Sequence, residues 1–210
     1  MAKKRVIKKV PVKDINKNVN FLSKLQGSLF YPGEFFSNLK ERETRPSLLF
    51  FTFVFLIYSL LAIIVEYNKV NSILRDFSPG LVIPVLFIIL IFASILGIVI
   101  LYLKALFLYI FIWVFRVDMK FNDVLKLRAY TSAPLIFAWI PIIGVLLAGI
   151  WGIVIEIIGL SKYAKINMTR AALIVLIPII ILLVILLLIV LFAVSLLLSS
   201  PAGFLIKDFL

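Results

Sequence analysis

Residues 81–115 read LVIPVLFIILIFASILGIVILYLKALFLYIFIWVF, and this stretch decides the class of the protein. Lys104 is its single charged residue. As one helix it would be about 52 Å long, whereas a hydrocarbon core is about 30 Å thick and needs roughly 20 apolar residues. We therefore expect a membrane-spanning helix that either tilts strongly or extends into the cytoplasm.

Four further apolar runs occur at 47–67, 129–140, 141–160 and 171–198. The chain is 64% hydrophobic and 15% charged, whereas a soluble domain is nearer one half and one quarter. We predict an all-α polytopic membrane protein with five transmembrane helices. Its expected parts are a basic cytosolic arm with a short interfacial amphipathic helix (1–46), the five-helix domain (47–198) and a short C-terminal tail (199–210).

The positions of Lys and Arg predict the orientation. With a cytoplasmic N-terminus and five crossings, eighteen of the 22 Lys and Arg residues lie inside, three lie outside, and Lys104 lies within a span. Cytoplasmic segments retain positive charge in this way. Splitting 81–115 would move four of these charges outside, and merging 129–160 would move three outside and run Pro141 through a helix interior. Five crossings with an external C-terminus fit best.

The third apolar run is short, with about twelve residues before Pro141. We expect its helix to begin nearer the cytoplasm, at Val124, with Asn122 or Asp123 as the N-cap. Pro134 and Pro141 would then bracket a bent, short helix that is followed at once by its antiparallel partner.

The segments at either end of the predicted bundle have sequence patterns that also predict helices. FYPGEFFSNLKERETRPS (30–47) predicts a short helix with Phe35 and Phe36 on one side. This helix lies either in the membrane interface or packed on the bundle as an ordinary linker. Pro32 and Pro46 favour the first turns of this helix and of the first crossing. The last run is apolar on every face, which indicates a peripheral, lipid-facing helix with Pro178 as a candidate kink.

Two stripes of small residues lie within the spans. Gly144, Ala148, Gly152 and Glu156 recur every four residues on the fourth predicted helix. Ala93, Gly97 and Lys104 share a face of the second. Small residues let helix backbones approach closely, so we expect both stripes to face other helices.

Lys104 and Glu156 are the only charged residues well inside the predicted spans. Either charge alone in lipid costs at least ~2.5 kcal/mol, so pairing is attractive although their predicted depths differ by about 9 Å. The pair is either a site for an ion, a proton or a polar headgroup, or a packing clamp in which Lys104 reaches the interface. Tyr130, Pro134 and Pro141, at the broken third helix, complete the candidate intramembrane site.

Composition excludes most enzyme classes. The chain has no Cys and no His, which removes thiol nucleophiles, imidazole bases and their metal sites. No phosphate-binding glycine loop or dinucleotide fingerprint occurs, so we expect no catalytic residues, no metal and no cofactor.

The net charge of +12 is concentrated in the N-terminal arm and the connecting segments, which argues against nucleic-acid binding. Lys3, Lys4, Arg5, Lys8 and Lys9 are candidate contacts for anionic lipid headgroups. The alternative is a solvated tail that only fixes the orientation.

Three segments together resemble the Yip1 domain family of five-helix membrane proteins: YPGEFFSNLKE (31–41), FNDVLKLRAYTSAPLIFAWIPIIG (121–144) and GIWGIVIEIIGLSKYAKINMTRAAL (149–173). The resemblance implies a cytosolic N-terminus, five helices and, in eukaryotic members, a role in membrane traffic with binding to Rab GTPases. Those members have longer, acidic arms. The short basic arm here is more similar to archaeal or bacterial members, which implies a prokaryotic cell membrane.

Two functions of different classes fit the sequence. The first is a non-enzymatic membrane scaffold or adaptor that organises lipids or recruits cytoplasmic protein partners in membrane organisation or trafficking-type processes. The second is a small transporter or channel that uses the broken third helix and the level of Lys104 and Glu156. The sequence favours the scaffold, because the polar residues available to line a path are few. It does not predict an oligomeric state.

Overall fold

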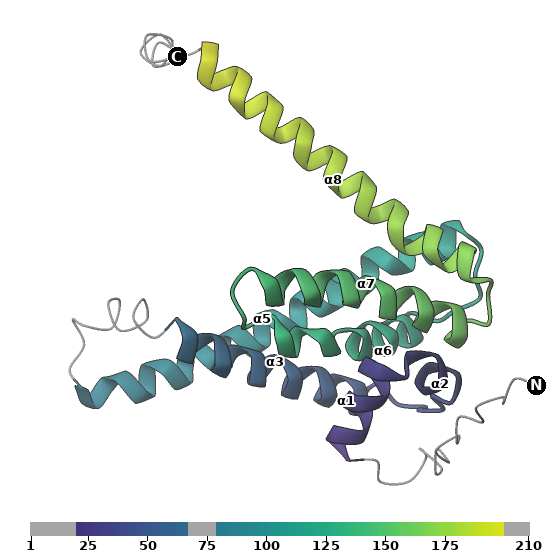
Figure 1. The fold of residues 1–210 in the computed structure, drawn as a ribbon, viewed down its shortest axis with the longest axis horizontal. Helices are drawn as coiled ribbons and strands as arrows, with labels where there is room; N and C mark the ends of the chain where they lie inside the picture. Colours follow the sequence, from purple (N-terminus) through teal and green to yellow (C-terminus); the bar gives the residue numbers. More distant parts are fainter. Residues whose placement is uncertain (1–19, 67–78, 200–210) are drawn as a thin grey trace, which may run out of the picture.

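The structure is a computed structural model that describes residues 20–66 and 79–199. All regular elements in these ranges are helices (Figure 1). In chain order they are α1 (Phe21–Phe30), α2 (Pro32–Ser37), α3 (Arg45–Val65), α5 (Pro79–Val114), α6 (Phe121–Thr131), the short 3-10 helix η1 (Ala133–Phe137), α7 (Ile143–Tyr163) and α8 (Met168–Ser199).

Four of these helices, α3, α5, α7 and α8, are long and apolar enough to cross a membrane. Helix α5 is continuous over 36 residues, as predicted, and Pro84 in its first turns does not divide it. The surface of the described chain carries a large excess of exposed Leu, Ile, Val and Phe, of which α8 alone contributes more than a dozen. Such a surface is stable only where lipid covers it.

The third predicted crossing is not one of the four spanning helices. Helix α6 ends at Thr131, and the chain continues as the 3-10 turn of η1. Ala133 and Pro134 are buried between α3 and α7, which both pack on η1. Protein instead of lipid surrounds this irregular backbone, and that is the condition under which a membrane tolerates it.

The N-cap of α6 lies two to three residues before the predicted positions, Asn122 and Asp123. Its N-cap is Lys120, which caps with its backbone carbonyl and not with its side chain. The aromatic ring of Phe121 lies between Tyr102 and Tyr109 of α5, at centroid distances of 6.3 and 5.7 Å. Packing of this ring, and not side-chain capping, sets where the helix begins.

Helices α1 and α2 form a cap on one end of the bundle (Figure 1). Pro32 and Pro46 lie in the first turns of α2 and α3, as predicted. Phe36 of α2 is only 1% exposed and packs against α7 at Gly159, where an added Cβ would lie 3.0 Å from the Phe36 ring. The structure shows that this segment forms a helix that packs on the bundle.

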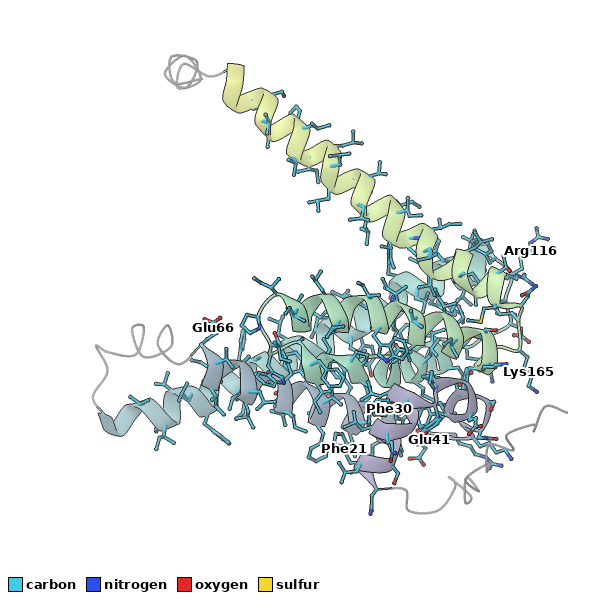
Figure 2. The ribbon with its side chains drawn as sticks, viewed as in Figure 1. Phe21, Phe30, Glu41, Glu66, Arg116 and Lys165 are labelled. Atoms are coloured by element: carbon cyan, nitrogen blue, oxygen red, sulfur yellow. The ribbon has the colours of Figure 1, made fainter. Side chains whose placement is uncertain are left out.

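Helix α8 leaves the bundle at an angle after its first turns (Figure 1). Ala171, Ile174 and Val175 are buried, whereas the side chains from Ile180 to Leu196 are exposed around the whole helix (Figure 2). Exposure on every face agrees with the peripheral, lipid-facing helix that its uniform apolar sequence predicts. Pro178 lies inside it without ending it.

A candidate polar site at the cap end of the bundle

Glu41 lies at the centre of a polar network that joins the cap to the bundle (Figure 2). Its carboxylate accepts a hydrogen bond from the Lys24 ammonium of α1 at 2.6 Å. The Tyr130 hydroxyl of α6 lies 2.8 Å from both Glu41 carboxylate oxygens and 3.0 Å from Lys24 Nζ. Tyr130 is fully buried, so this hydroxyl depends on Glu41 and Lys24 for its hydrogen bonds. We call these three side chains the Glu41 network.

Lys126 of α6 binds the segment that contains Glu41 and Arg42 at a second point. It is 3% exposed, and its ammonium donates to the backbone carbonyls of Glu41 at 2.9 Å and Arg42 at 3.2 Å. It also pairs with Asp123 at 3.2 Å, and Asp123 accepts a hydrogen bond from Tyr163 of α7 at 3.0 Å. All three donor positions of this ammonium are therefore used, which is how a protein accommodates a buried charge.

Glu156 pairs with Arg128 of α6 instead of Lys104. Arg128 Nη1 lies 2.6 Å from Glu156 Oε2, and the Glu156 side chain is only 4% exposed. The contact is single, because Glu156 Oε1 and Arg128 Nε are both buried without a hydrogen-bond partner among the described residues. A buried charge pair with two unused polar atoms is incompletely satisfied and carries a desolvation cost.

Lys104 is exposed on α5, and it makes no hydrogen bond or ion pair with any described residue. It is nevertheless close enough to both Arg128 and Glu156 for their charges to act on it. Sequence reasoning thus placed Lys104 and Glu156 in one region but did not identify Arg128 as the partner of Glu156.

The depth of Lys104 follows from the packing of α3 against α5. The two helices are antiparallel (Figure 1), and an added Cβ on Gly97 would lie 3.1 Å from the Phe55 ring. Lys104, seven residues beyond Gly97, is therefore about level with Leu48 in the first turn of α3. This places Lys104 beside the cap end of α3, and not beside its middle.

The small residues that were predicted to face other helices lie at contacts between helices. Gly144 and Ala148 are buried, and an added Cβ on Gly144 would lie 2.0 Å from the Phe137 carbonyl oxygen of η1. Gly152 is half-buried with the Thr131 carbonyl oxygen 4.0 Å from its added Cβ. The stripe of α7 therefore faces α6 and η1, whereas Gly97 of the other stripe faces α3.

The remaining predicted residues divide into two groups. Tyr130 belongs to the Glu41 network, Pro134 opens η1, and Pro141 lies exposed in the turn before α7. The candidate headgroup contacts of the arm, Lys3 to Lys9, lie outside the described residues. The sequence analysis did not identify four residues of these polar contacts: Lys24, Glu41, Lys126 and Arg128. The closely spaced acidic residues Glu41 and Glu43 in a basic segment were a usable signal.

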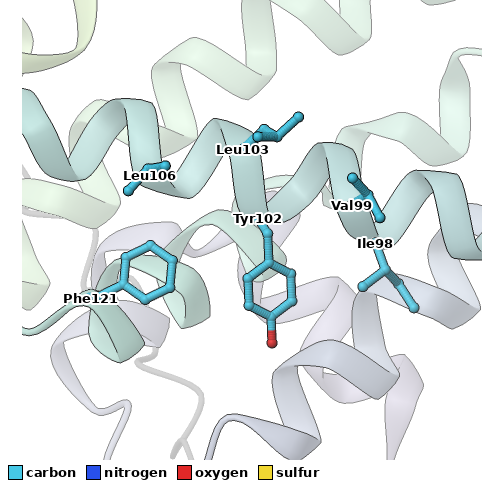
Figure 3. Close-up of a pocket in the computed structure, with 6 residues that line it drawn as sticks. All are labelled: Ile98, Val99, Tyr102, Leu103, Leu106 and Phe121. Atoms are coloured by element: carbon cyan, nitrogen blue, oxygen red, sulfur yellow. The ribbon is translucent and has the colours of Figure 1, made fainter.

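A separate groove of about 410 Å³ lies along α5 (Figure 3). Five of its residues come from α5 and one from α6, and its only side-chain polar atom is the Tyr102 hydroxyl: Ile98, Val99, Tyr102, Leu103, Leu106 and Phe121. Its apolar lining is typical of a surface that contacts lipid chains, and it is unsuited to a polar solute.

Together the apolar helices and the polar cap end define an integral membrane protein built as a helical bundle. Comparison with known protein families matches residues 27–199 to the Yip1 domain. The match covers most of the chain, and the protein belongs to the Yip1 domain family. No curated protein and no solved structure matches it.

Proposed function

We propose that this Yip1-family protein is a non-enzymatic scaffold of a prokaryotic cell membrane, which organises anionic lipids or holds a protein partner at its cytoplasmic face. The observation that carries the proposal is the attachment of the cap. Glu41 and Lys126 bind α1 and the segment before α3 to α6 through partly buried charge-assisted hydrogen bonds. Bonds of this kind are short and strong, so the cap is a fixed surface and not a lid that opens.

The scaffold would have five crossings, a cytoplasmic N-terminus and an external C-terminus. Helix α6 and η1 together form the third crossing in this proposal. Eleven α-helical residues and five 3-10 residues extend about 27 Å, close to the ~30 Å that a bilayer core requires. In Figure 1 the two elements run alongside α7 in the opposite direction. The cap would then lie on the cytoplasmic side, next to the basic arm.

The second candidate function is a small transporter or channel. It is favoured by the broken third segment beside a buried carboxylate with an unpaired oxygen. The scaffold is preferred because Glu156 is 3% exposed and already bound by Arg128, so a passing solute has no access to it in this conformation.

The experiment that tests the scaffold uses the full chain in vesicles that contain fluorescent phosphatidylglycerol and an internal ion-sensitive dye. We expect phosphatidylglycerol to gather around the protein, as measured by energy transfer, without any ion flux above that of empty vesicles. Replacing Lys3, Lys4, Arg5, Lys8 and Lys9 together by Ala should reduce the gathering. A protein-dependent flux that Glu156→Gln abolishes would instead establish the transporter.

A further inference from the structure

We propose that Lys104 and Arg128 form a binding site for the phosphate of one anionic phospholipid in the leaflet at the cap end of the bundle. The site lies in the membrane domain and is separate from the N-terminal arm. It therefore goes beyond the scaffold function and rests on that proposal only for the position of the membrane.

The charges around the site do not balance. Arg128 pairs with Glu156 at 2.6 Å, and α6, which carries Arg128, packs on α5 at Tyr102 and Tyr109, on either side of Lys104 in the sequence. Two cations thus face a single carboxylate, and the charges of Arg128 and Glu156 act on Lys104. Glu156 is committed to Arg128 Nη1, which leaves the ammonium of Lys104 without a partner among the described residues. A net positive charge at a membrane boundary attracts an anion strongly, because the surrounding lipid screens it poorly.

Arg128 has donor capacity left for that anion. Its side chain is 23% exposed, and of its nitrogens only Nε is both buried and unpaired. The second terminal nitrogen, Nη2, is therefore accessible and makes no described hydrogen bond. The contact with Glu156 fixes the guanidinium plane, so an arriving phosphate meets an oriented donor instead of a mobile side chain.

The surroundings identify a lipid as the source of the phosphate. Lys104 is about level with Leu48 in the first turn of α3, at the height of the headgroups in the proposed orientation. Ile100, one turn deeper on the same face of α5, is 42% exposed, and the neighbouring Leu103 is 60% exposed. Acyl chains cover such side chains, and the phosphate of a lipid with its chains beside Ile100 and Leu103 would reach Lys104.

The net charge of the headgroup determines which lipid the site takes. Phosphatidylglycerol carries a net negative charge on its phosphate, whereas phosphatidylcholine has no net charge, and we expect phosphatidylcholine to bind more weakly.

The test is native mass spectrometry of the full chain in a neutral detergent, titrated separately with phosphatidylglycerol, phosphatidylcholine and inorganic phosphate. We expect one saturable phosphatidylglycerol site, with phosphatidylcholine bound at least about tenfold more weakly. Lys104→Gln should weaken phosphatidylglycerol binding by about tenfold, the effect of losing one charge-assisted hydrogen bond. Lys104 is exposed, so this variant should fold normally.

Three further variants serve as controls for the effect of Lys104→Gln. Lys120→Gln removes an equally exposed charge at the N-cap of α6 and should leave the affinity unchanged. Substituting the five basic residues of the arm by Ala should also leave this site intact, although it tests the proposed scaffold function. Glu156→Gln removes the competing negative charge and should not weaken binding. Equal affinities for Lys104→Gln and Lys120→Gln, or displacement of the lipid by equimolar inorganic phosphate, would overturn the proposal.

Discussion

Tyr130 is the residue at which the cap, α3 and α6 meet. Its ring packs edge-on against Phe35 of α2 at 5.1 Å and against Phe50 of α3 at 4.9 Å, while its hydroxyl lies between Glu41 and Lys24. One side chain thus combines apolar packing with the polar contacts that hold the cap. Replacing Tyr130 by Phe removes the hydroxyl but keeps the ring, so their contributions to stability can be measured separately.

Tyr130→Phe should lower the free energy of unfolding by about 1–3 kcal/mol, because Glu41 and Lys24 each lose a hydrogen bond in a buried site. The measurement is thermal unfolding of the full chain in detergent. Tyr58→Phe is the matched control, since Tyr58 packs on Phe55 and makes no hydrogen bond among the described residues. Equal melting temperatures for the two variants would show that the hydroxyl contributes nothing.

Gly144 is required by a close approach to backbone. An added Cβ would lie 2.0 Å from the Phe137 carbonyl oxygen and 2.8 Å from Ile140 Cβ, and neither is the end of a flexible side chain. Gly144→Ala should therefore destabilise the bundle by about 1–3 kcal/mol through overpacking.

Gly149 provides the control for that substitution on the same helix. An added Cβ there would meet nothing within 4 Å. Gly149→Ala should raise the stability by about 0.5–1 kcal/mol, the ordinary gain for Ala over Gly in a helix. If thermal unfolding showed that Gly144→Ala and Gly149→Ala change the stability in the same direction, the result would contradict the close contact with η1.

At the scale of whole helices, the sequence predicts those features that depend on the length and hydropathy of a segment. It correctly predicted that α5 is undivided, and the exposed apolar side chains on every face of α8 agree with the prediction of a lipid-facing helix. It did not predict where the third apolar run stops being α-helical. The residues around Pro134 are as apolar as a spanning helix, and only their burial between α3 and α7 allows the 3-10 geometry of η1.

The polar contacts were also difficult to predict, because they too depend on how distant parts of the chain pack together. Glu41 and Tyr130 are 89 residues apart in the chain, and Arg128 and Glu156 are 28 apart. No periodicity connects such positions. The sequence could show that Glu156 needs a cation, but the choice between Lys104 and Arg128 depends on how α6 and α7 pack.

The docking of α2 gives a prediction at this scale. Phe36→Ala should remove most of the burial that attaches α2 to α7 and cost about 3–5 kcal/mol, which exposes the backbone amides of α1 and α2 to hydrogen exchange. Phe30→Ala, at a ring that is 65% exposed, should leave the exchange unchanged. Unchanged protection of residues 21–37 in both variants would mean that the cap is held by its polar contacts alone.

For the molecule as a whole, the asymmetry between its two ends determines how it can act. The polar contacts gather at the cap end, where α1, α2, α6 and the last turns of α7 meet, whereas the other described surfaces of α5 and α8 are apolar. Among the described residues, the polar surface would therefore face one side of the membrane. This consequence holds only if the crossings have the proposed orientation.

The orientation can be measured directly, because the chain contains no Cys and each introduced thiol is the only one. We would introduce single Cys residues by Ser37→Cys in α2, Asp118→Cys between α5 and α6, and Ile142→Cys in the turn before α7. All three positions are exposed, and Ile142 has a backbone φ of 62°, which is unfavourable for a β-branched residue and easier for Cys. Labelling uses an impermeant maleimide on intact cells and then on permeabilised cells.

With five crossings, Ile142→Cys should react in intact cells, while Ser37→Cys and Asp118→Cys should react only after permeabilisation. If α6 and η1 do not cross, Ile142→Cys lies on the same side as Asp118→Cys, and both need permeabilisation. Labelling of Ser37→Cys in intact cells would invert the whole orientation and place the cap outside. The position of Ile142 relative to Ser37 therefore decides whether a broken, protein-covered segment completes the bundle as a fifth crossing.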